Sequence, residues 1–375
     1  MFKATRALVA KDLLVSRRNP VFFLLGVVVP LMFVLLYAFI VGAATTAPIG
    51  FAVESQGPQT QKFMQTIRSM QSEDGDAWEI RTTDPDEARK LYESGETVGV
   101  ITIPASFESD MEKGRAKTEV LTRNINSDIT KNLNLRMQDA IGMVQQAEDS
   151  DHLVAVKEQN RWSTDMSFTR YMGASLLMFA ILYASMVNTG TLIAREWEER
   201  TAKTLVLSPK GWWPLVIGKW LTAFIQTAIT MVLVGGVLWL ALDYPVHRLG
   251  PGSWGPLLLF FLYGSALGVL LGVALRRSLP LVPIAAVVTL VHFLVFGFES
   301  YMRGYAHEGL VEFLWWCARF WPVSSAIDQI RYAVEGLEPY YSQSHYLLWL
   351  SAVIVALVGA AIAVLRKRIR FTQGQ

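Results

Sequence analysis

Long apolar runs alternate with polar stretches along this chain, and the runs set its architecture. Six of them are long enough to cross the roughly 30 Å hydrocarbon layer of a membrane as helices, which takes about 20 mostly apolar residues. We place them at residues 21–43, 171–194, 214–242, 256–275, 280–298 and 346–365. The pattern therefore predicts a polytopic α-helical membrane protein with six transmembrane helices.

Residues 1–20 precede the first run and show a different pattern. Apolar side chains such as Leu8 and Leu13 alternate with lysines and arginines, as in helices that lie in the plane of the membrane interface. Pro20 disfavours helix in the residue before it. We expect an amphipathic interface helix over residues 2–18, followed at once by the first transmembrane helix.

Residues 44–170 break the apolar pattern and predict a separate α+β domain inserted after the first transmembrane helix. Short runs with strand composition lie at 49–53, 78–82, 98–103 and 117–123. Helical patterns run from Pro85 to Gly95, from Pro104 to Gly114, and over 127–157. The start of the first helix is the best defined, because Asp84 can cap it and Pro85 suits its first position.

A second polar stretch, residues 299–345, is rich in aromatic side chains. Its pattern predicts one helix over Glu312–Trp321, a break at Pro322, and a second helix over Val323–Gly336. The stretch is too polar to span a membrane, so we expect re-entrant or interfacial helices, where tryptophan and tyrosine are favoured. Residues 366–375 then form a basic tail.

The composition agrees with a membrane protein. The chain is 52% hydrophobic and 18% charged, with a mean hydropathy of +0.32, which is too apolar for an ordinary soluble enzyme. Cys317 is the only cysteine, so we expect the inserted domain to hold together without an intrachain disulfide.

The distribution of charge predicts the orientation of the chain. With six crossings, the N-terminal arm, the loops at 195–213 and 276–277, and the tail fall on one side, and each carries a basic cluster. Cytoplasmic loops are enriched in lysine and arginine, so both termini are expected in the cytoplasm. Residues 44–170 contain 14 basic and 21 acidic side chains, which makes the extracytoplasmic domain acidic.

The loop at 195–213 is the most distinctive motif. It begins with a dense run of both charges, and we single out these residues as contacts for another protein: Arg195, Glu196, Glu198, Glu199, Arg200, Thr201, Leu205, Ser208 and Pro209. Acidic residues contribute little to membrane orientation. The run therefore favours a short exposed helix that a partner binds, although a solvated connection whose charges only set topology is the alternative.

The fourth run carries Gly264, Gly268 and Gly272 at intervals of four residues. Small residues on one helix face allow close packing of backbones in a membrane. We expect this face to pack within the chain, with an interface between subunits as the alternative.

Residues with the potential for chemistry are few. The sequence has no P-loop, no HExxH metal motif and no Gly-x-Ser-x-Gly turn. Ser185, Asn188 and His292 are polar groups at membrane depth, and Glu299 lies at the outer end of the fifth run. Such groups are candidates for a translocation path, although they also hydrogen-bond between helices for structural reasons. No cofactor or metal is expected on this chain.

With these features, the chain resembles the permease subunit of type-2 ABC exporters, in the subgroup with a large external domain after the first helix. The family form of the charged loop is close to Ala-Arg-Glu-Arg-Glu-x-Gly-Thr-Leu-x-x-Leu-Leu-x-Ser-Pro. Matches fall at Ala194, Arg195, Glu196, Glu198, Thr201, Leu205, Ser208 and Pro209, and Gly218-Lys219 fits a lysine common after the proline. The chain departs at Arg200, where the family usually has glycine, and at Ala202, where it has leucine. Trp321-Pro322 with Asp328 and Arg331 resembles the outer helix of the family.

The resemblance implies a mechanism and partners. A separate cytoplasmic ATPase would bind ATP-Mg, and the loop at 195–213 would dock in it as a coupling helix. A second permease, identical or a paralogue, would complete a dimer in the bacterial inner membrane, with a periplasmic adaptor as a further partner. The low polarity of the runs favours export of amphipathic, drug-like or lipid-like molecules, as in multidrug efflux. The alternatives are a membrane sensor or scaffold that signals through this loop, and a membrane-embedded lipid transferase, for which no convincing pair of acidic residues is present.

Overall fold

The computed structural model describes two compact units. One unit comprises Met1–Ala38 and Trp162–Gln375, and the other comprises Phe39–Arg161. The structure describes residues 2–44, 48–72, 75–94, 96–97, 99–112, 116–122, 135–143, 168–201, 213–299, 309–336 and 344–371.

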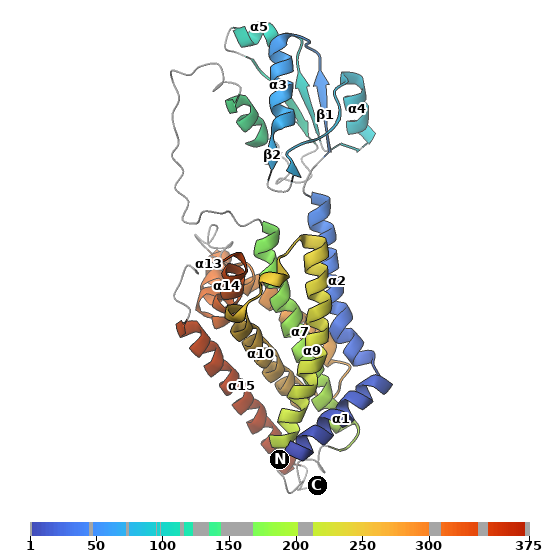
Figure 1. Ribbon diagram of the computed structural model, residues 1–375, viewed down its shortest axis with the longest axis vertical. Coiled ribbons are helices and arrows are strands. Elements are labelled where there is room, and N and C mark those ends of the chain that lie inside the picture. The colour runs from blue at the N-terminus through green and yellow to red at the C-terminus, as the bar shows by residue number, and fades with distance from the viewer. Residues whose placement is uncertain are drawn as a thin grey trace. The chain divides into compact units, whose positions relative to one another are not determined.

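The first unit is a bundle of helices (Figure 1). Its helices are α1 (Phe2–Arg18), α2 (Val21–Ala44), α7 (Phe168–Glu198), α9 (Trp213–Leu242), α10 (Pro251–Leu275), α11 (Leu281–Phe296), α13 (Gly309–Phe320), α14 (Pro322–Glu335) and α15 (Ser344–Phe371). A 3-10 turn, η1 (Val246–Arg248), connects α9 to α10. The two helices predicted around Pro322 are confirmed as α13 and α14.

Helices cover all six apolar runs, but they differ in length. Five of them, α2, α7, α9, α10 and α15, are long and apolar enough to cross a membrane. The remaining helix, α11, is apolar but has only 16 residues. At 1.5 Å per residue it extends about 24 Å, less than the roughly 30 Å of hydrocarbon. The described helices thus form a polytopic membrane protein with five full-length candidate spans.

Helix α7 is the centre of this bundle. Within its most apolar window 94% of the residues are buried inside the protein, against 17% for α15. The three glycines of the fourth apolar run lie on α10 and pack closely against α7. An added Cβ at Gly268 would lie 2.5 Å from the carbonyl oxygen of Met186, and one at Gly272 would lie 2.6 Å from that of Gly190. Gly264 likewise faces Ser185, so all three glycines pack against α7 of the same chain.

The second unit is built on a four-stranded sheet in the order β4-β1-β5-β6. Strand β1 (Pro48–Val53) pairs in parallel with β4 (Glu79–Thr82) and β5 (Gly99–Ile103), and β6 (Glu119–Thr122) pairs antiparallel to β5. The four predicted strands are confirmed. A short hairpin of β2 (Gln71–Ser72) and β3 (Gly75–Asp76), which the pattern did not predict, lies apart from this sheet.

Helices cover both faces of the sheet. Phe63 and Ile67 of α3 (Pro58–Ser69) pack on one face with Phe51 of β1, whereas Ala88 of α4 (Pro85–Ser94) packs on the other face, against Ala52. The α+β arrangement expected for this region is therefore wrong in one respect, because its central strands are parallel and carry helices on both sides. Parallel neighbours need a crossover helix, and α3 is the crossover that the sequence pattern did not predict.

The predicted helix starts in this unit are mostly correct. The backbone N–H of Glu87 donates to Asp84 Oδ1 at 2.9 Å, which confirms Asp84 as the cap of α4. The helix expected after Pro104 is α5 (Phe107–Glu112). Of the long helix expected over 127–157, residues 135–143 are helical and the others lie outside the described residues.

Glu108 of α5 caps the start of α3 from outside. Its carboxylate accepts hydrogen bonds from the backbone N–H of Gln59 (3.3 Å) and Thr60 (2.7 Å), and from the Thr60 hydroxyl (2.8 Å). A Cβ on Gly57 would lie 2.0 Å from its Cδ, so a side chain there would displace the carboxylate. Partial burial by itself raises the pKa of Glu108, but these hydrogen bonds outweigh burial and lower it.

We predict that Glu108→Gln destabilises α3 by about 1 kcal/mol at pH 7, the usual size of a helix cap. Because the folded pKa of Glu108 is depressed, its contribution is present above the unfolded value of about 4.3 and is lost as pH falls through the folded pKa. Hydrogen exchange of the amides at the start of α3 in the full-length protein measures this effect. Gly57→Ala should reproduce it, whereas Asp110→Asn on the same helix should not, and equal exchange in all three variants would contradict the capping role.

Candidate functional site

The described part of the charged loop forms the end of α7. We call residues Arg195–Thr201 the α7 tip; the helix runs to Glu198 and turns at Glu199 and Arg200. Leu205, Ser208 and Pro209, the other predicted contact residues, lie outside the described residues. Figure 1 shows α1 beside the first turns of α9 at this end of the bundle, and the two helices are in contact.

Glu196 lies in a buried cluster of four charges. Its carboxylate accepts hydrogen bonds from Lys219 of α9 and from Lys11 of α1, the latter at 2.8 Å. Lys219 also donates to Asp12 of α1 at 2.9 Å. The Thr201 hydroxyl donates to the second oxygen of Glu196. We call Lys11, Asp12, Glu196 and Lys219 the four-charge cluster; it joins three helices.

The four-charge cluster is balanced, and three of its members, Asp12, Glu196 and Lys219, are buried, whereas Lys11 lies at its exposed edge. Its two cations match its two carboxylates, and the side chain of Lys219 is only 2% exposed. Burial by itself lowers the pKa of Lys11, but its hydrogen bond with Glu196 and the nearby carboxylates outweigh burial and raise it. Lys11 therefore stays charged across the physiological pH range, and each buried charge keeps a partner.

Helix α1 packs against the bundle through this polar side. Thr5 and Asp12 are buried, and Ser16 accepts a hydrogen bond from Gln226 of α9 at 2.9 Å. The apolar Leu14 is 50% exposed on another side of the helix. The helix predicted over residues 2–18 is confirmed, and its attachment depends on specific polar contacts.

Glu198 attaches the tip to the connection between α10 and α11. Its carboxylate accepts hydrogen bonds from the backbone N–H (2.8 Å) and hydroxyl (2.9 Å) of Ser278, in the connection from α10 to α11. In the same connection, the guanidinium of Arg276 lies over the ring of Trp197, 4.9 Å from its centroid. The α7 tip is therefore fixed to α1 and α9 on one side and to the α10–α11 connection on the other.

The outer surface of the tip carries Glu199 and Arg200. Both side chains are exposed, and among the described residues neither makes a side-chain hydrogen bond. Arg200 has φ = 60°, in the left-handed region that favours glycine, and this explains why glycine is usual there in the family form of the motif. The expectation of a wholly exposed Glu/Arg helix is wrong for Glu196, which is buried, and for Arg195, which is half-buried 5.6 Å from the Phe22 ring centroid.

The polar groups at membrane depth have partners inside the bundle. Asn188 donates to Thr227 of α9 at 3.3 Å, and Ser185 donates to the carbonyl of Leu182 where α10 crosses α7. A Cβ on Gly26 of α2 would lie 2.9 Å from Asn188 Oδ1, so α2 approaches closely here. These contacts are the kind that hold membrane helices together.

His292 is held between two helical turns and α10. Its Nδ1 lies 2.7 Å from the carbonyl oxygen of Val288, which can only accept, so the proton is on Nδ1. Its Nε2 then accepts from the Tyr263 hydroxyl at 2.8 Å. Glu299 is buried just beyond the end of α11. His292 and Glu299 therefore do not belong to the α7 tip but lie on α11 and just beyond its end.

Arg331 of α14 fixes the opposite end of α7. Its guanidinium donates to the carbonyl of Tyr171 and to the Ser175 hydroxyl, both at 3.1 Å, and to Asp328 of its own helix. It also donates to the carbonyl of Gly297 at 3.1 Å and lies 3.5 Å from the Tyr171 ring centroid. The Asp328 and Arg331 pattern noted in the sequence is therefore a structural clamp between α14 and α7.

Comparison with known proteins identifies one family. A family model described as ABC-2 family transporter protein matches residues 20–363, which covers most of the chain. No curated protein and no solved structure matches the chain.

We predict that the two lysines of the four-charge cluster differ sharply in importance. Lys219→Met leaves Asp12 and Glu196 as buried carboxylates with only Lys11 between them and should cost about 3–5 kcal/mol. Lys11→Met should cost about 1 kcal/mol or less, because the Lys11 side chain is 41% exposed. Thermal unfolding of the purified variants in one detergent measures the difference. A loss for Lys219→Met no larger than that for Lys11→Met would show that burial does not govern the cluster.

Proposed function

This chain belongs to the ABC-2 family of transporter proteins, and on that basis we propose that it is the permease of an exporter for amphipathic molecules. Family membership makes it a multi-pass transmembrane subunit of an ABC transporter whose partner is an ABC ATPase subunit. The direction of transport, the cargo and the contact surface are our proposals. The observation that carries the proposed contact surface is the α7 tip, which combines a fixed base with an exposed charged surface.

We place the contact with the ATPase on the outer surface of the tip and the loop that follows. Glu199 and Arg200 present opposite charges to the outside, and complementary charges give orientation and register to a polar interface. Glu196 has a positioning role, because its carboxylate is already bonded to α1 and α9. ATP-Mg would be bound and hydrolysed by the partner.

The internal bonds of the tip suggest how a movement of the partner would spread. A displacement of the tip acts on α1 and α9 through Glu196, and on the α10–α11 connection through Glu198. Helix α7 is packed on nearly all sides within the bundle. It would therefore move as a packed body together with its neighbours, in keeping with the bistable behaviour of packed elements.

The proposed sidedness follows from the basic clusters. Lysines and arginines near the ends of membrane helices favour the cytoplasm. Lys11 and Lys219 contact Glu196 of the α7 tip, and Arg195 is the first residue of the tip. We propose that both termini and the tip are cytoplasmic, that the unit comprising Phe39–Arg161 is extracytoplasmic, and that the membrane is the bacterial inner membrane. A second permease, identical or paralogous, and a periplasmic adaptor complete the proposed assembly.

Amphipathic cargo is supported by the low polarity of the bundle, in which Ser185, Asn188 and His292 all have internal hydrogen-bond partners. The alternative is a membrane sensor whose external unit binds a ligand and signals through the tip. ATP-dependent efflux of a lipophilic dye from vesicles containing both subunits would favour the exporter. ATPase binding without any efflux would favour the sensor.

We predict that the double variant Glu199→Lys with Arg200→Glu weakens binding of the co-expressed ABC ATPase at least tenfold while thermal stability stays within about 0.5 kcal/mol, as for other surface changes. Co-purification and ATPase stimulation measure the two effects. Arg248→Glu is the matched control, because it reverses a charge on η1, at the other end of α9.

Three outcomes separate the parts of the proposal. Unchanged ATPase binding by the double variant would contradict docking on the tip. Weaker binding by Arg248→Glu to the same degree would show a general effect of charge. Failure of the unaltered chain to bind any ABC ATPase would contradict the transporter assignment itself.

A further inference from the structure

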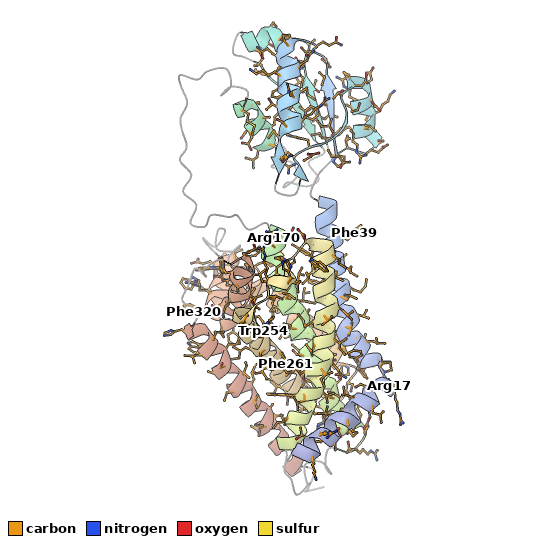
Figure 2. All side chains as sticks on the ribbon, in the orientation of Figure 1. Arg17, Phe39, Arg170, Trp254, Phe261 and Phe320 are labelled. Atoms are coloured by element: carbon orange, nitrogen blue, oxygen red, sulfur yellow. The ribbon has the colours of Figure 1, made fainter. Side chains whose placement is uncertain are left out.

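A long apolar groove runs between α9 and α10. It has a volume of about 780 Å³ and is floored by Leu177 and Ile181 of α7. Side chains of α9 and α10 form its walls, among them Phe224 and Phe261, and η1 contributes His247 at one end. Figure 2 shows Trp254 and Phe261 following one another along α10. Thr227 and His247 are the polar side chains in an otherwise apolar lining.

Part of the groove stays open because α9 has no side chain at two of its lining positions. Gly235 and Gly236 are adjacent, and a Cβ added at Gly236 would meet no atom within 4 Å. A Cβ at Gly235 would just touch Val246 at 3.4 Å. Both helices pack extensively on α7 but make few contacts with each other. The space is therefore a consequence of sequence on α9, and it is bounded by packed helices.

The groove is open to the outside of the bundle. Along its rim, Val232 is 76% exposed, Trp254 63% and Trp239 56%. In a membrane protein such a surface faces hydrocarbon, and an apolar space at this depth does not hold water. The molecule that fills it must therefore come from the lipid phase or be another helix.

The dimensions of the groove suit a single extended hydrocarbon chain. The lining residues on α9 run from Phe224 to Trp239, which is about 22 Å at 1.5 Å per residue. This length exceeds the roughly 15 Å of hydrocarbon in one leaflet of the membrane. Dividing 780 Å³ by this length gives a mean cross-section of about 35 Å², the area of a circle about 7 Å across. A helix with side chains is about 10–12 Å wide and does not fit. A single hydrocarbon chain does.

One end of the groove suits a polar headgroup. Trp239, Trp254 and His247 of η1 line this end. Tryptophans gather at the level of lipid headgroups, where an apolar ring and an N–H group are both satisfied. His247 can donate a hydrogen bond to a phosphate oxygen.

We propose that this groove binds one acyl chain of a membrane phospholipid, with the phosphate of that lipid at His247. An acyl chain gains little by moving from the bilayer into an apolar groove, because both are equally apolar. Retention of the lipid then depends on the fit along α9 and on the contact at His247. The site requires only that the chain spans a membrane, so it stands independently of the export proposal.

The test uses the full-length chain in nanodiscs of phosphatidylethanolamine and phosphatidylglycerol. A trace of phosphatidylethanolamine carrying a photoactivatable group on its acyl chain labels the protein, and labelled peptides are mapped. We expect labelling concentrated in peptides containing Phe224–Trp239 and Trp254–Phe261. Gly236→Phe fills the groove and should reduce this labelling at least fivefold. Gly359→Phe is the control, because Gly359 on α15 also faces open space.

A second blocking variant, Ala228→Phe, keeps the test decisive if Gly236→Phe does not fold. His247→Leu should lower the amount of phospholipid that co-purifies after detergent exchange, which tests the headgroup contact. Labelling spread evenly over all exposed helices, or unchanged in both blocking variants, would overturn the proposal. Disulfide formation between two copies through Val232→Cys in a Cys317→Ala background would also overturn it, because a second copy would then cover the groove.

Discussion

The arrangement of this end of the bundle depends on the buried charges Asp12, Glu196 and Lys219, with Lys11 at the exposed edge of the same site. Lys219 is a fully buried ammonium group, and an unpaired charge there would be strongly destabilising. Asp12 of α1 and Glu196 of α7 both contact it and balance its charge. Because these residues come from three helices, the position of α1 and the end of α7 are set together.

Helix α7 extends this constraint through the whole bundle. Charged side chains fix its tip, the glycines of α10 pack closely against its middle, and Arg331 of α14 clamps its beginning. A helix held in this way cannot move independently of its neighbours. With the ATPase docked on the tip, as we propose, α7 would carry a displacement together with its neighbours. The groove between α9 and α10 lies on the outside of this packed core.

The sequence predicts those features that depend on nearby residues. Apolar runs locate the membrane helices, and Asp84 with Pro85 locates the start of α4, since both signals are local. Helix α3 was not predicted because Gly57 offers no capping side chain, and the cap comes from Glu108 on another helix. Because the pattern does not predict this crossover helix, it also does not predict that β1 and β4 pair in parallel.

The candidate site shows the same limit more strongly. The charged motif identifies the α7 tip, but it cannot show which of its charges face inward. Glu196 and Lys11 form a hydrogen bond although they are 185 residues apart in the sequence, and Lys219 and Asp12 are 207 residues apart. The one available signal is Asp12, an acidic residue in an otherwise basic α1. The most direct test is a double-mutant cycle of Glu196→Gln and Lys219→Met on the unfolding of the purified chain, without any ATPase. A coupling energy of at least about 1 kcal/mol is expected for contacting residues, whereas additive losses would contradict the claim that Glu196 acts within the chain.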